Sequence, residues 1–339
     1  MTGSLRPARA ETAITLTLAL VALVGCAGRQ TEPATDTGAQ VTCEIGAETR
    51  VSIATGNATG VYYSLGNAFA EQLSAATDGK LRATAAETGA SVQNIQQLVD
   101  GQYQVAFSLF DTATDAVAGT GAFTEKQPVQ ALSRIYDNYT QVVVRTDSGI
   151  TSIADMKGKT ISTGSPKSGT EVIANRLLQS AGLNPDTDIT PQRLDLTKSV
   201  DGMKDGSIDG LIWSGGLPTP GITDLFTTLG TDATFIDITP LLPQMQEINT
   251  AYQSATIPAA TYKTATDAPT IAVPNVLLVK DDIDANTACV LTQTLFEKKP
   301  ELVKANAAAN GINLDTARDT DPVTLNRGAV AALDQLGAP

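Results

Sequence analysis

The chain has 339 residues, a formal net charge of −13, three cysteines and no histidine. The missing histidine excludes a Ser-His-Asp triad, a Cys-His dyad and any histidine-ligated metal site. We therefore expect no enzymatic activity, no metal and no other cofactor, although catalysis by carboxylates or lysines stays open as a rival hypothesis. The acidic balance argues against a nucleic-acid partner, because binding to phosphates needs a basic surface.

The first residues have the features of an export signal. Two arginines precede an apolar run over residues 13–24, which is too short for a membrane span of about 20 residues. The run ends in a Leu-Val-Gly triplet before Cys26, a pattern that resembles a bacterial lipobox. We predict a lipoprotein signal peptide over residues 1–25 and an acylated Cys26 that anchors the exported chain on the extracytoplasmic face of the cell membrane, in the periplasm or at the cell surface. A plain signal peptide with an incidental cysteine is the alternative.

The residues after the signal have no apolar periodicity. They are rich in Thr, Ala, Gly and Pro, a composition typical of a flexible tether, which we place at residues 26–42. Beyond the acylated Cys26, Cys43 and Cys289 remain as an even pair in an oxidising compartment. We predict that they form a disulfide between the start of the folded chain and its C-terminal part; two free buried thiols are the alternative.

Strands and helices alternate from residue 51 onward. Residues 51–54 read as a strand, and the helix after them repeats its apolar side chains every three or four residues and ends at Gly79. A second helix begins near Ser91 and leads directly into a strand over residues 105–108. Short strands that alternate with helices predict a mainly parallel sheet.

The same order recurs in the second part of the chain. A strand over residues 159–162 is followed by a glycine-rich loop and a helix that ends at Gly182. A shorter helix then ends at Gly206 before a strand over residues 211–213. The repetition predicts two lobes built on one plan.

Two β-rich stretches, residues 141–145 and 271–279, flank the second unit. We interpret them as the crossings between the lobes, with residues 43–141 and 275–339 in lobe 1 and residues 142–274 in lobe 2. Two crossings form a hinge, and a hinge allows a cleft to close. The predicted fold is therefore α/β and two-lobed, with two mainly parallel sheets and flanking helices, and we expect a monomer.

Three glycine-containing loops lead into predicted helix starts, at residues 60–64, 89–91 and 165–170. Helix N-termini expose unpaired N–H groups with a partial positive charge, and glycine lets an anion approach them closely. Across a hinge, such loops would form a polar cleft suited to carboxylates. A capping box at Ser168 and Glu171, together with tight turns, would explain the same residues without a ligand.

Several side chains near these loops are candidates for ligand contact. Trp213, the only tryptophan, stands at a strand end beside glycines, where it would wall a pocket or pack in the core. Asp111 would accept a hydrogen bond from a ligand ammonium group, bridge the lobes or lie in a solvated turn. The candidate ligand-binding residues are Thr59, Gly60, Tyr62, Tyr63, Gly89, Ser91, Asp111, Ser165, Ser168, Gly169, Thr170, Trp213 and Gly215.

The cationic residues nearest to these motifs are Lys167, Arg134 and Arg145. A bidentate arginine is the usual clamp for a carboxylate. The sequence leaves open whether any of the three contacts a ligand.

Six segments resemble, in order, the motifs of TAXI-type solute receptors of TRAP (tripartite ATP-independent periplasmic) transporters. The resemblance extends from about residue 51 to 279, with a looser tail, and the ordered combination is far more specific than any one motif. The segments are TGNATGVYYSLG at 55–66, TGASVQN at 88–94, IADMKGK at 153–159, GSPKSGTE at 164–171, GGLPTPGI at 215–222 and TIPAATY at 256–262.

This resemblance implies a periplasmic-binding-protein-like (type II) fold with two hinge crossings. It also implies an extracytoplasmic receptor that captures a small organic anion or amino acid, glutamate-like or a dicarboxylate, and delivers it to a TRAP-type membrane permease. Carried over position by position, it makes residues 60–63, 89–91, 168–170 and 213–216 the walls of the cleft. A sensor that reports the ligand to a membrane receptor is the alternative function.

The chain departs from the resembling family at two places. Lys167 stands where relatives tend to have a small residue, and residues 137–138 stand where they tend to have a proline-containing pair. The identity of the solute therefore cannot be inferred directly from the relatives.

Overall fold

The computed structural model describes residues 40–339, of which Val41–Pro339 form one compact unit. The predicted signal peptide, Cys26 and the tether up to residue 39 lie outside the described residues. Within residues 40–339, none of the helices combines the length and the apolar character that crossing a membrane requires.

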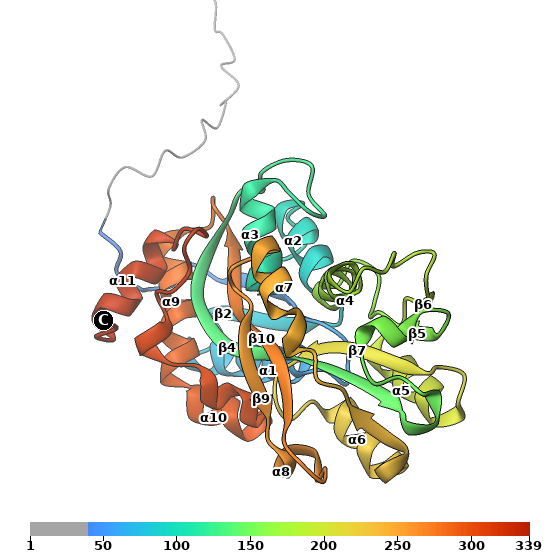
Figure 1. The fold of residues 1–339 in the computed structure, drawn as a ribbon. Helices are drawn as coiled ribbons and strands as arrows, with labels where there is room; N and C mark the ends of the chain where they lie inside the picture. The colour runs from blue at the N-terminus through green and yellow to red at the C-terminus, as the bar shows by residue number, and fades with distance from the viewer. Residues whose placement is uncertain (1–39) are drawn as a thin grey trace, which may run out of the picture. The chain divides into compact units, whose positions relative to one another are not determined.

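Strands and helices alternate through most of the compact unit (Figure 1). The strands are β1 Thr49–Ala54, β2 Leu81–Ala86, β3 Val105–Leu109, β4 Val129–Arg145, β5 Thr160–Ser162, β6 Thr190–Gln192, β7 Gly210–Gly215, β8 Ala233–Phe235, β9 Gln253–Ile257 and β10 Ala268–Lys280. The helices are α1 Val61–Ala76, α2 Ser91–Val99, α3 Phe110–Ala118, α4 Gly169–Ser180, α5 Leu196–Asp205, α6 Pro220–Leu229, α7 Leu242–Ile248, α8 Ala259–Tyr262, α9 Ala285–Glu297, α10 Lys299–Ala305 and α11 Arg327–Gln335.

The strands form a continuous path in the order β2-β1-β3-β10-β4-β7-β5-β6. One end of this path is a parallel trio, β2-β1-β3, and the other end is a second parallel trio, β7-β5-β6. The long strands β4 and β10 run antiparallel to each other between the trios. Strand β10 pairs with β3 of the first trio, and β4 pairs with β7 of the second. We call the part built on β2-β1-β3 the first lobe and the part built on β7-β5-β6 the second lobe.

This arrangement confirms the predicted two-lobed α/β fold with two crossing strands. The two parallel trios correspond to the two predicted sheets, and the antiparallel β4 and β10 join them into one path. The change-over points at residues 142 and 275 stay a prediction.

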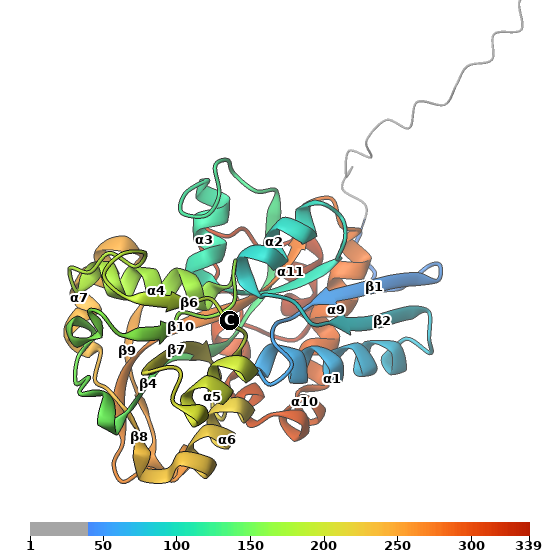
Figure 2. The same ribbon diagram turned by 90° about the vertical axis from the view of Figure 1, so that its right-hand side faces the viewer.

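The first lobe has helices on both faces of its strands (Figure 2). Along β10, Leu277 and Val279 face α1, α9 and α10, whereas Val276 and Leu278 face α2 and α3. This alternation follows from the two-residue period of a strand, which points successive side chains to opposite faces. Both faces are apolar because both are covered, as expected for parallel strands.

The second lobe is built in the same way. Ile212 of β7 packs with α4 and α7, while Leu211 and Trp213 on the opposite face pack with α5 and α6. The helices begin at defined caps: the Asp195 side chain accepts a hydrogen bond from the N–H of Lys198 at the start of α5. Such a cap satisfies an N–H group that the helix itself leaves unpaired.

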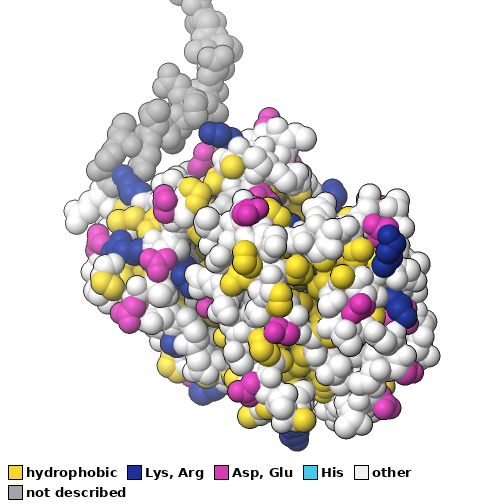
Figure 3. Space-filling model, viewed as in Figure 1, with side chains coloured by type: hydrophobic (Ala, Val, Ile, Leu, Met, Phe, Trp, Pro, Cys, Tyr) yellow, Lys and Arg dark blue, Asp and Glu magenta, His cyan; other side chains and the backbone are white. Residues whose placement is uncertain are grey.

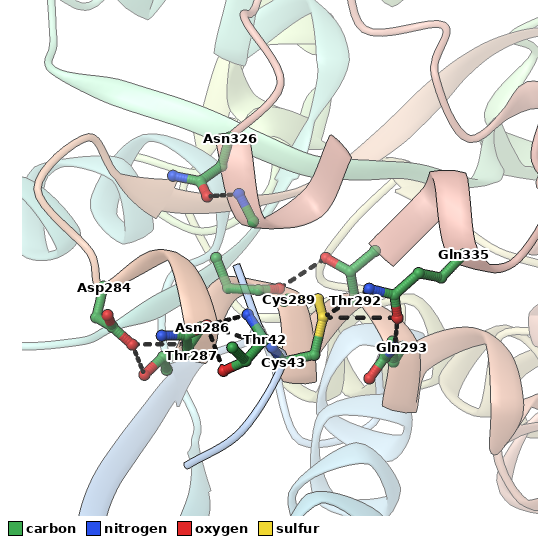
Figure 4. The surroundings of a disulfide bond; sticks show 12 residues. Thr42, Cys43, Asp284, Asn286, Thr287, Cys289, Thr292, Gln293, Asn326 and Gln335 are labelled. Carbon is green, nitrogen blue, oxygen red and sulfur yellow. Dashed lines mark hydrogen bonds between the residues drawn. A yellow bond between two sulfur atoms is a disulfide. The ribbon is translucent and has the colours of Figure 1, made fainter. Parts of the chain in front are cut away.

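A disulfide joins Cys43 to Cys289 of α9, which confirms the predicted pairing (Figure 4). Beside it, the backbone N–H of Thr42 donates to Asn286 Oδ1 at 2.8 Å, so the chain is also held there by a hydrogen bond. The two cysteines are 246 residues apart in sequence. A link of this length removes much conformational freedom from the unfolded chain and stabilises the fold by about 2–4 kcal/mol.

The surface carries charges of both signs. On the face shown in Figure 3, the blue basic side chains lie among magenta acidic ones. Most ion pairs on the described part of the molecule have at least one exposed partner, and in Arg82–Glu48, at 3.3 Å, both are exposed. Pairs of this kind contribute little to stability because water screens them.

Candidate functional site

A pocket lies between the two lobes, where strands β1, β3 and β7 reach their carboxyl ends. It contains about 410 Å³ of empty space, open solvent at its mouth included. We call it the interlobe pocket; its walls are Gly56, Asn57, Gly60, Val61, Tyr62, Gly89, Ala90, Ser91, Leu109, Asn138, Ser168, Gly169, Thr170, Trp213, Ser214 and Gly215. Its position follows the general rule that ligands of α/β sheets bind outside the carboxyl ends of the strands.

Most of the candidate ligand-binding residues meet in this pocket. Those that line it are Gly60, Tyr62, Gly89, Ser91, Ser168, Gly169, Thr170, Trp213 and Gly215. The three predicted loops thus converge, with the starts of α1 and α2 from the first lobe opposite the start of α4 from the second.

Two of the three helix starts are open. Neither α1, after Gly60, nor α2, after Ala90, has a side-chain cap or an acidic residue in its first turn. At α4, by contrast, Ser168 Oγ accepts a hydrogen bond from the N–H of Glu171 at 2.9 Å, and the Glu171 carboxylate lies in the first turn. The positive ends of α1 and α2 therefore face the pocket without a carboxylate in the first turn, although the carbonyl oxygen of Lys167 accepts the Gln93 N–H of α2. The positive end of α4 is partly neutralised.

The loop before α2 has an unusual backbone conformation. Ala90 has φ 78° and ψ −152°, a region that side chains other than glycine rarely adopt. The adjacent N–H of Gly89 donates to Gln93 Oε1 at 2.8 Å. Strained backbone of this kind persists only where the surroundings hold it, and here it forms part of a pocket wall.

Trp213 and Ser214 place two buried polar atoms at the pocket without a partner. Trp213 is 8% exposed and Ser214 is 6% exposed. Within residues 40–339, neither Trp213 Nε1 nor Ser214 Oγ has a hydrogen-bond partner. An unpaired buried polar atom costs about 1–3 kcal/mol, so each of these two atoms needs an explanation.

The remaining polar side chains of the pocket are held by one another. Tyr62 donates through its hydroxyl to Asn275 Oδ1, and Asn275 Nδ2 donates to Asn138 Oδ1 at 2.8 Å. Asn138 Nδ2 in turn donates to the carbonyl oxygen of Ser214 at 3.1 Å. Burial raises the pKa of the Tyr62 hydroxyl well above its ordinary value, so Tyr62 is neutral at physiological pH.

Hydrogen bonds across the pocket hold the lobes together. Asn57 Oδ1, from the first lobe, accepts from Ser165 Oγ and from the N–H of Leu196, both at 3.1 Å. The N–H of Gln93 donates to the carbonyl oxygen of Lys167 at 3.0 Å. The lobes are therefore in contact around the interlobe pocket, which corresponds to a closed arrangement.

Four candidates lie outside the pocket walls. Thr59 and Ser165 bridge the lobes beside it, Thr59 through an oxygen–oxygen contact of 3.2 Å with Thr197. Tyr63 is half-buried on α1, next in the chain to Tyr62. Asp111 is fully buried beneath the pocket, on α3.

Asp111 belongs to a buried ion cluster that also joins the lobes. Arg176 of α4 contacts Asp111 Oδ2 at 2.9 Å and Asp115 Oδ2 at 2.6 Å. Tyr252 accepts a hydrogen bond from Arg176 at 2.9 Å and donates to Asp111. We call these four residues the Arg176 cluster. Its carboxylates are occupied by the arginine and are not among the groups that line the pocket.

Protonation in the Arg176 cluster follows from burial. Burial raises the pKa of the Asp115 carboxyl, and the Arg176 charge offsets only part of this effect. Burial acts to lower the pKa of Arg176, but the negative groups around it outweigh burial, so its pKa lies above the ordinary value. The arginine therefore stays charged and balances the charge of one carboxylate.

None of the three cationic candidates lines the interlobe pocket. Lys167 Nζ donates to Gln96 Oε1 at 3.1 Å, Arg134 pairs with Asp137 at 3.1 Å, and Arg145 pairs with Asp147 at 3.0 Å. Among the described residues, no group of three or more Cys, Asp or Glu side chains is placed to hold a metal ion.

Three polar wall residues are absent from the ligand-contact candidates named from the sequence: Asn57, Asn138 and Ser214. Asn57 lies in the TGNATG loop, and Asn138 lies within the long strand β4. Polar residues are frequent along β4, so no local signal distinguishes Asn138, and only the fold shows that it is buried. Ser214 follows Trp213, and its lack of a partner cannot be seen without the fold.

Solved structures of other proteins share this architecture. A protein from Bordetella bronchiseptica RB50 is 20% identical, with a TM-score of 0.51 over 84% of this chain and 81% of that chain. The binding protein component of an ABC phosphonate transporter from Pseudomonas aeruginosa is 14% identical, with a TM-score of 0.52 over 77% of this chain and 79% of that chain. At these identities the similarity establishes the two-lobed fold of periplasmic binding proteins and does not identify the solute.

A family model narrows the assignment. The description of the matching model is the NMT1-like family, and the match covers residues 53–337. This range includes both lobes and every wall of the interlobe pocket. The chain therefore belongs to the NMT1-like family.

Proposed function

We propose that this protein is an exported solute receptor that captures a small organic anion in the interlobe pocket and performs no chemistry on it. The observation that carries the proposal is the pair of unpartnered buried atoms, Trp213 Nε1 and Ser214 Oγ, beside two open helix ends. A closing cleft of this kind binds its solute by trapping it between the lobes. The fold shared with a phosphonate-binding protein supports a binding role.

The single tryptophan provides a direct test, because Trp213 lines the pocket. Solute binding is expected to change its intrinsic fluorescence and to raise the melting temperature in proportion to the logarithm of solute concentration. Organic acids, amino acids and sugars form the screening panel. If no member of the panel changed either signal, the proposal would have to be given up.

A matched variant separates pocket binding from nonspecific effects. Trp213→Phe keeps an aromatic wall but lacks the Nε1 donor, so the solute found in the screen is expected to bind about 10-fold more weakly by calorimetry. Phe123→Leu serves as the control, since Phe123 is buried away from the interlobe pocket, among the first-lobe residues that pack with α2 and α3. Its solute affinity is expected to stay within about twofold of the parent protein.

We further propose that the receptor serves a TAXI-type TRAP transporter and delivers its solute to the membrane permease. The ordered motifs from residue 55 to 262 support this assignment, and the lipobox-like segment before Cys26 supports anchoring on the extracytoplasmic face. Solute uptake into cells that carry a TAXI-type permease should require this receptor. Cys26→Ser should release the protein from the membrane fraction, and retention there would contradict the lipid anchor.

A further inference from the structure

The walls of the interlobe pocket carry no ionisable side chain that is charged at neutral pH. Among the described residues, those that line it include no Asp, Glu, Lys or Arg, and its only titratable group is the Tyr62 hydroxyl. Asp111, the nearest candidate partner for an ammonium group, is occupied by Arg176. A charged solute must therefore be held by neutral groups and helix ends alone.

The side-chain oxygens of the walls are already in use as acceptors. Asn138 Oδ1 accepts from Asn275, and Asn57 Oδ1 accepts from two donors of the second lobe. The hydroxyl oxygens of the walls likewise accept backbone N–H groups: that of Thr170 from Ser214 at 3.2 Å, that of Ser91 from Leu109 at 3.0 Å and that of Ser168 from Glu171 at 2.9 Å. The exceptions are Ser214 Oγ and the Tyr62 hydroxyl, which donates to Asn275. The pocket thus offers donors to a ligand far more readily than acceptors.

The helix ends set how much charge the pocket can hold. The N-terminus of a helix is equivalent to roughly half a positive elementary charge. Two open ends, those of α1 and α2, therefore balance about one negative charge. A second carboxylate would lie buried without a cation, and an ammonium group would lie buried without an anion; each costs several kcal/mol.

From this balance we infer that the solute is a singly charged organic acid without an ammonium group. The inference rests on the proposed function and narrows its ligand class, excluding the amino-acid-like and dicarboxylate solutes expected from the sequence. Trp213 Nε1 and Ser214 Oγ donate to the headgroup, which is a carboxylate or a sulfonate. The uncharged remainder of the solute lies against Leu109, Val61 and the Tyr62 ring.

A series of probes on one carbon skeleton tests the inference. Butyrate and propane-1-sulfonate carry one negative charge, succinate carries two, 2-aminobutyrate adds an ammonium group, and butyramide is neutral. Dissociation constants come from Trp213 fluorescence and calorimetry on the full-length protein at pH 7, and the series is repeated with skeletons of two to six carbons. At the best length, a singly charged acid is expected to bind at least 10-fold more tightly than the other three classes.

The outcomes separate this inference from the proposed function. If an amino acid or a dicarboxylate bound most tightly, or the neutral amide bound as well as the acid, the solute class would be wrong while the receptor function held. If no probe of any class or length bound, both would fail. Ser214→Ala should weaken the singly charged acid about 10-fold, and an unchanged affinity in this variant would remove Ser214 from the headgroup site.

Discussion

The interlobe pocket and the Arg176 cluster both lie between the lobes, and both are buried and polar. In the Arg176 cluster, one guanidinium satisfies two carboxylates and a tyrosine hydroxyl within 3.0 Å. In the interlobe pocket, two side-chain atoms of Trp213 and Ser214 have no partner anywhere in residues 40–339. A polar cluster whose groups are all hydrogen-bonded stabilises the structure. A buried polar group without a partner destabilises it, and a ligand that supplies the partner removes this cost on binding.

This difference also explains why the two regions take different residues. The cluster uses formal charges, which must be paired when buried. The pocket uses neutral donors, which cost less free energy than charged groups when they are buried without a ligand. Four changes test the comparison, in order of expected effect.

Arg176→Leu is expected to have the largest effect, because it leaves Asp111 and Asp115 buried without a counter-charge. The free energy of unfolding should fall by about 3–5 kcal/mol in urea titrations. Arg193→Leu is the matched control, since Arg193 also contacts two carboxylates but is 52% exposed. It should cost no more than about 1 kcal/mol. Equal losses in the two variants would show that burial does not distinguish these arginines.

Gly169→Ala tests the closed contact between the lobes. A Cβ atom at residue 169 would lie 2.5 Å from Leu109 Cδ1 and 2.7 Å from Ser91 Oγ, both of the first lobe. Closure would therefore be strained by about 1–3 kcal/mol, and solute affinity should fall about 10- to 100-fold in calorimetry. Gly46→Ala is the control, because nothing lies within 4 Å of a Cβ atom there. Unchanged affinity in Gly169→Ala would mean that the solute binds without this contact.

Ser214→Ala should move stability and binding in opposite directions. Removing an unpaired buried hydroxyl should leave the free energy of unfolding unchanged or raise it by up to about 1 kcal/mol, while affinity falls about 10-fold. In the control Ser162→Ala, a buried hydroxyl loses its 2.6 Å contact with Ser199. That variant should lose about 1 kcal/mol of stability and keep its affinity. A destabilised Ser214→Ala protein would indicate a hydrogen bond in the free state.

Asp115→Asn should give the smallest effect, visible in its pH dependence. Burial raises the folded-state pKa of Asp115 above its unfolded value of about 3.9. Its contribution to stability is therefore complete below pH 3.9 and is lost as pH rises through the folded-state pKa. The variant cannot titrate there, so its stability relative to the parent protein should rise, on the order of 1 kcal/mol, as the pH increases above about 3.9. The exposed Asp186→Asn is the control, and a falling difference would reverse the predicted sign.

Much of the fold can be predicted from local patterns, but four strands were missed: β2, β6, β8 and β9. The longest of them is β2 at residues 81–86, which lies at the end of the strand path. Its alternating Thr and Ala side chains are small, and Leu81 is the only large apolar one. Its position is decided by parallel pairing with β1 along six residues, a contact between segments about 30 residues apart.

The sequence by itself determined what depends on short spacing. The alternation of strands and helices, the Ser168 cap of α4, the glycine loops and the even cysteine pair all follow from neighbouring residues or residue counts. The predicted capping box is only half formed, because the Glu171 carboxylate accepts the N–H of Lys167 and not that of Ser168. The tertiary structure alone decided which buried polar groups find partners. The Asp111 carboxylate contacts an arginine 65 residues away, whereas the Ser214 hydroxyl has no hydrogen-bond partner among the described residues. Hydrogen bonds and ion pairs reach only about 3 Å, so their formation depends on how distant segments pack, and no local pattern records that.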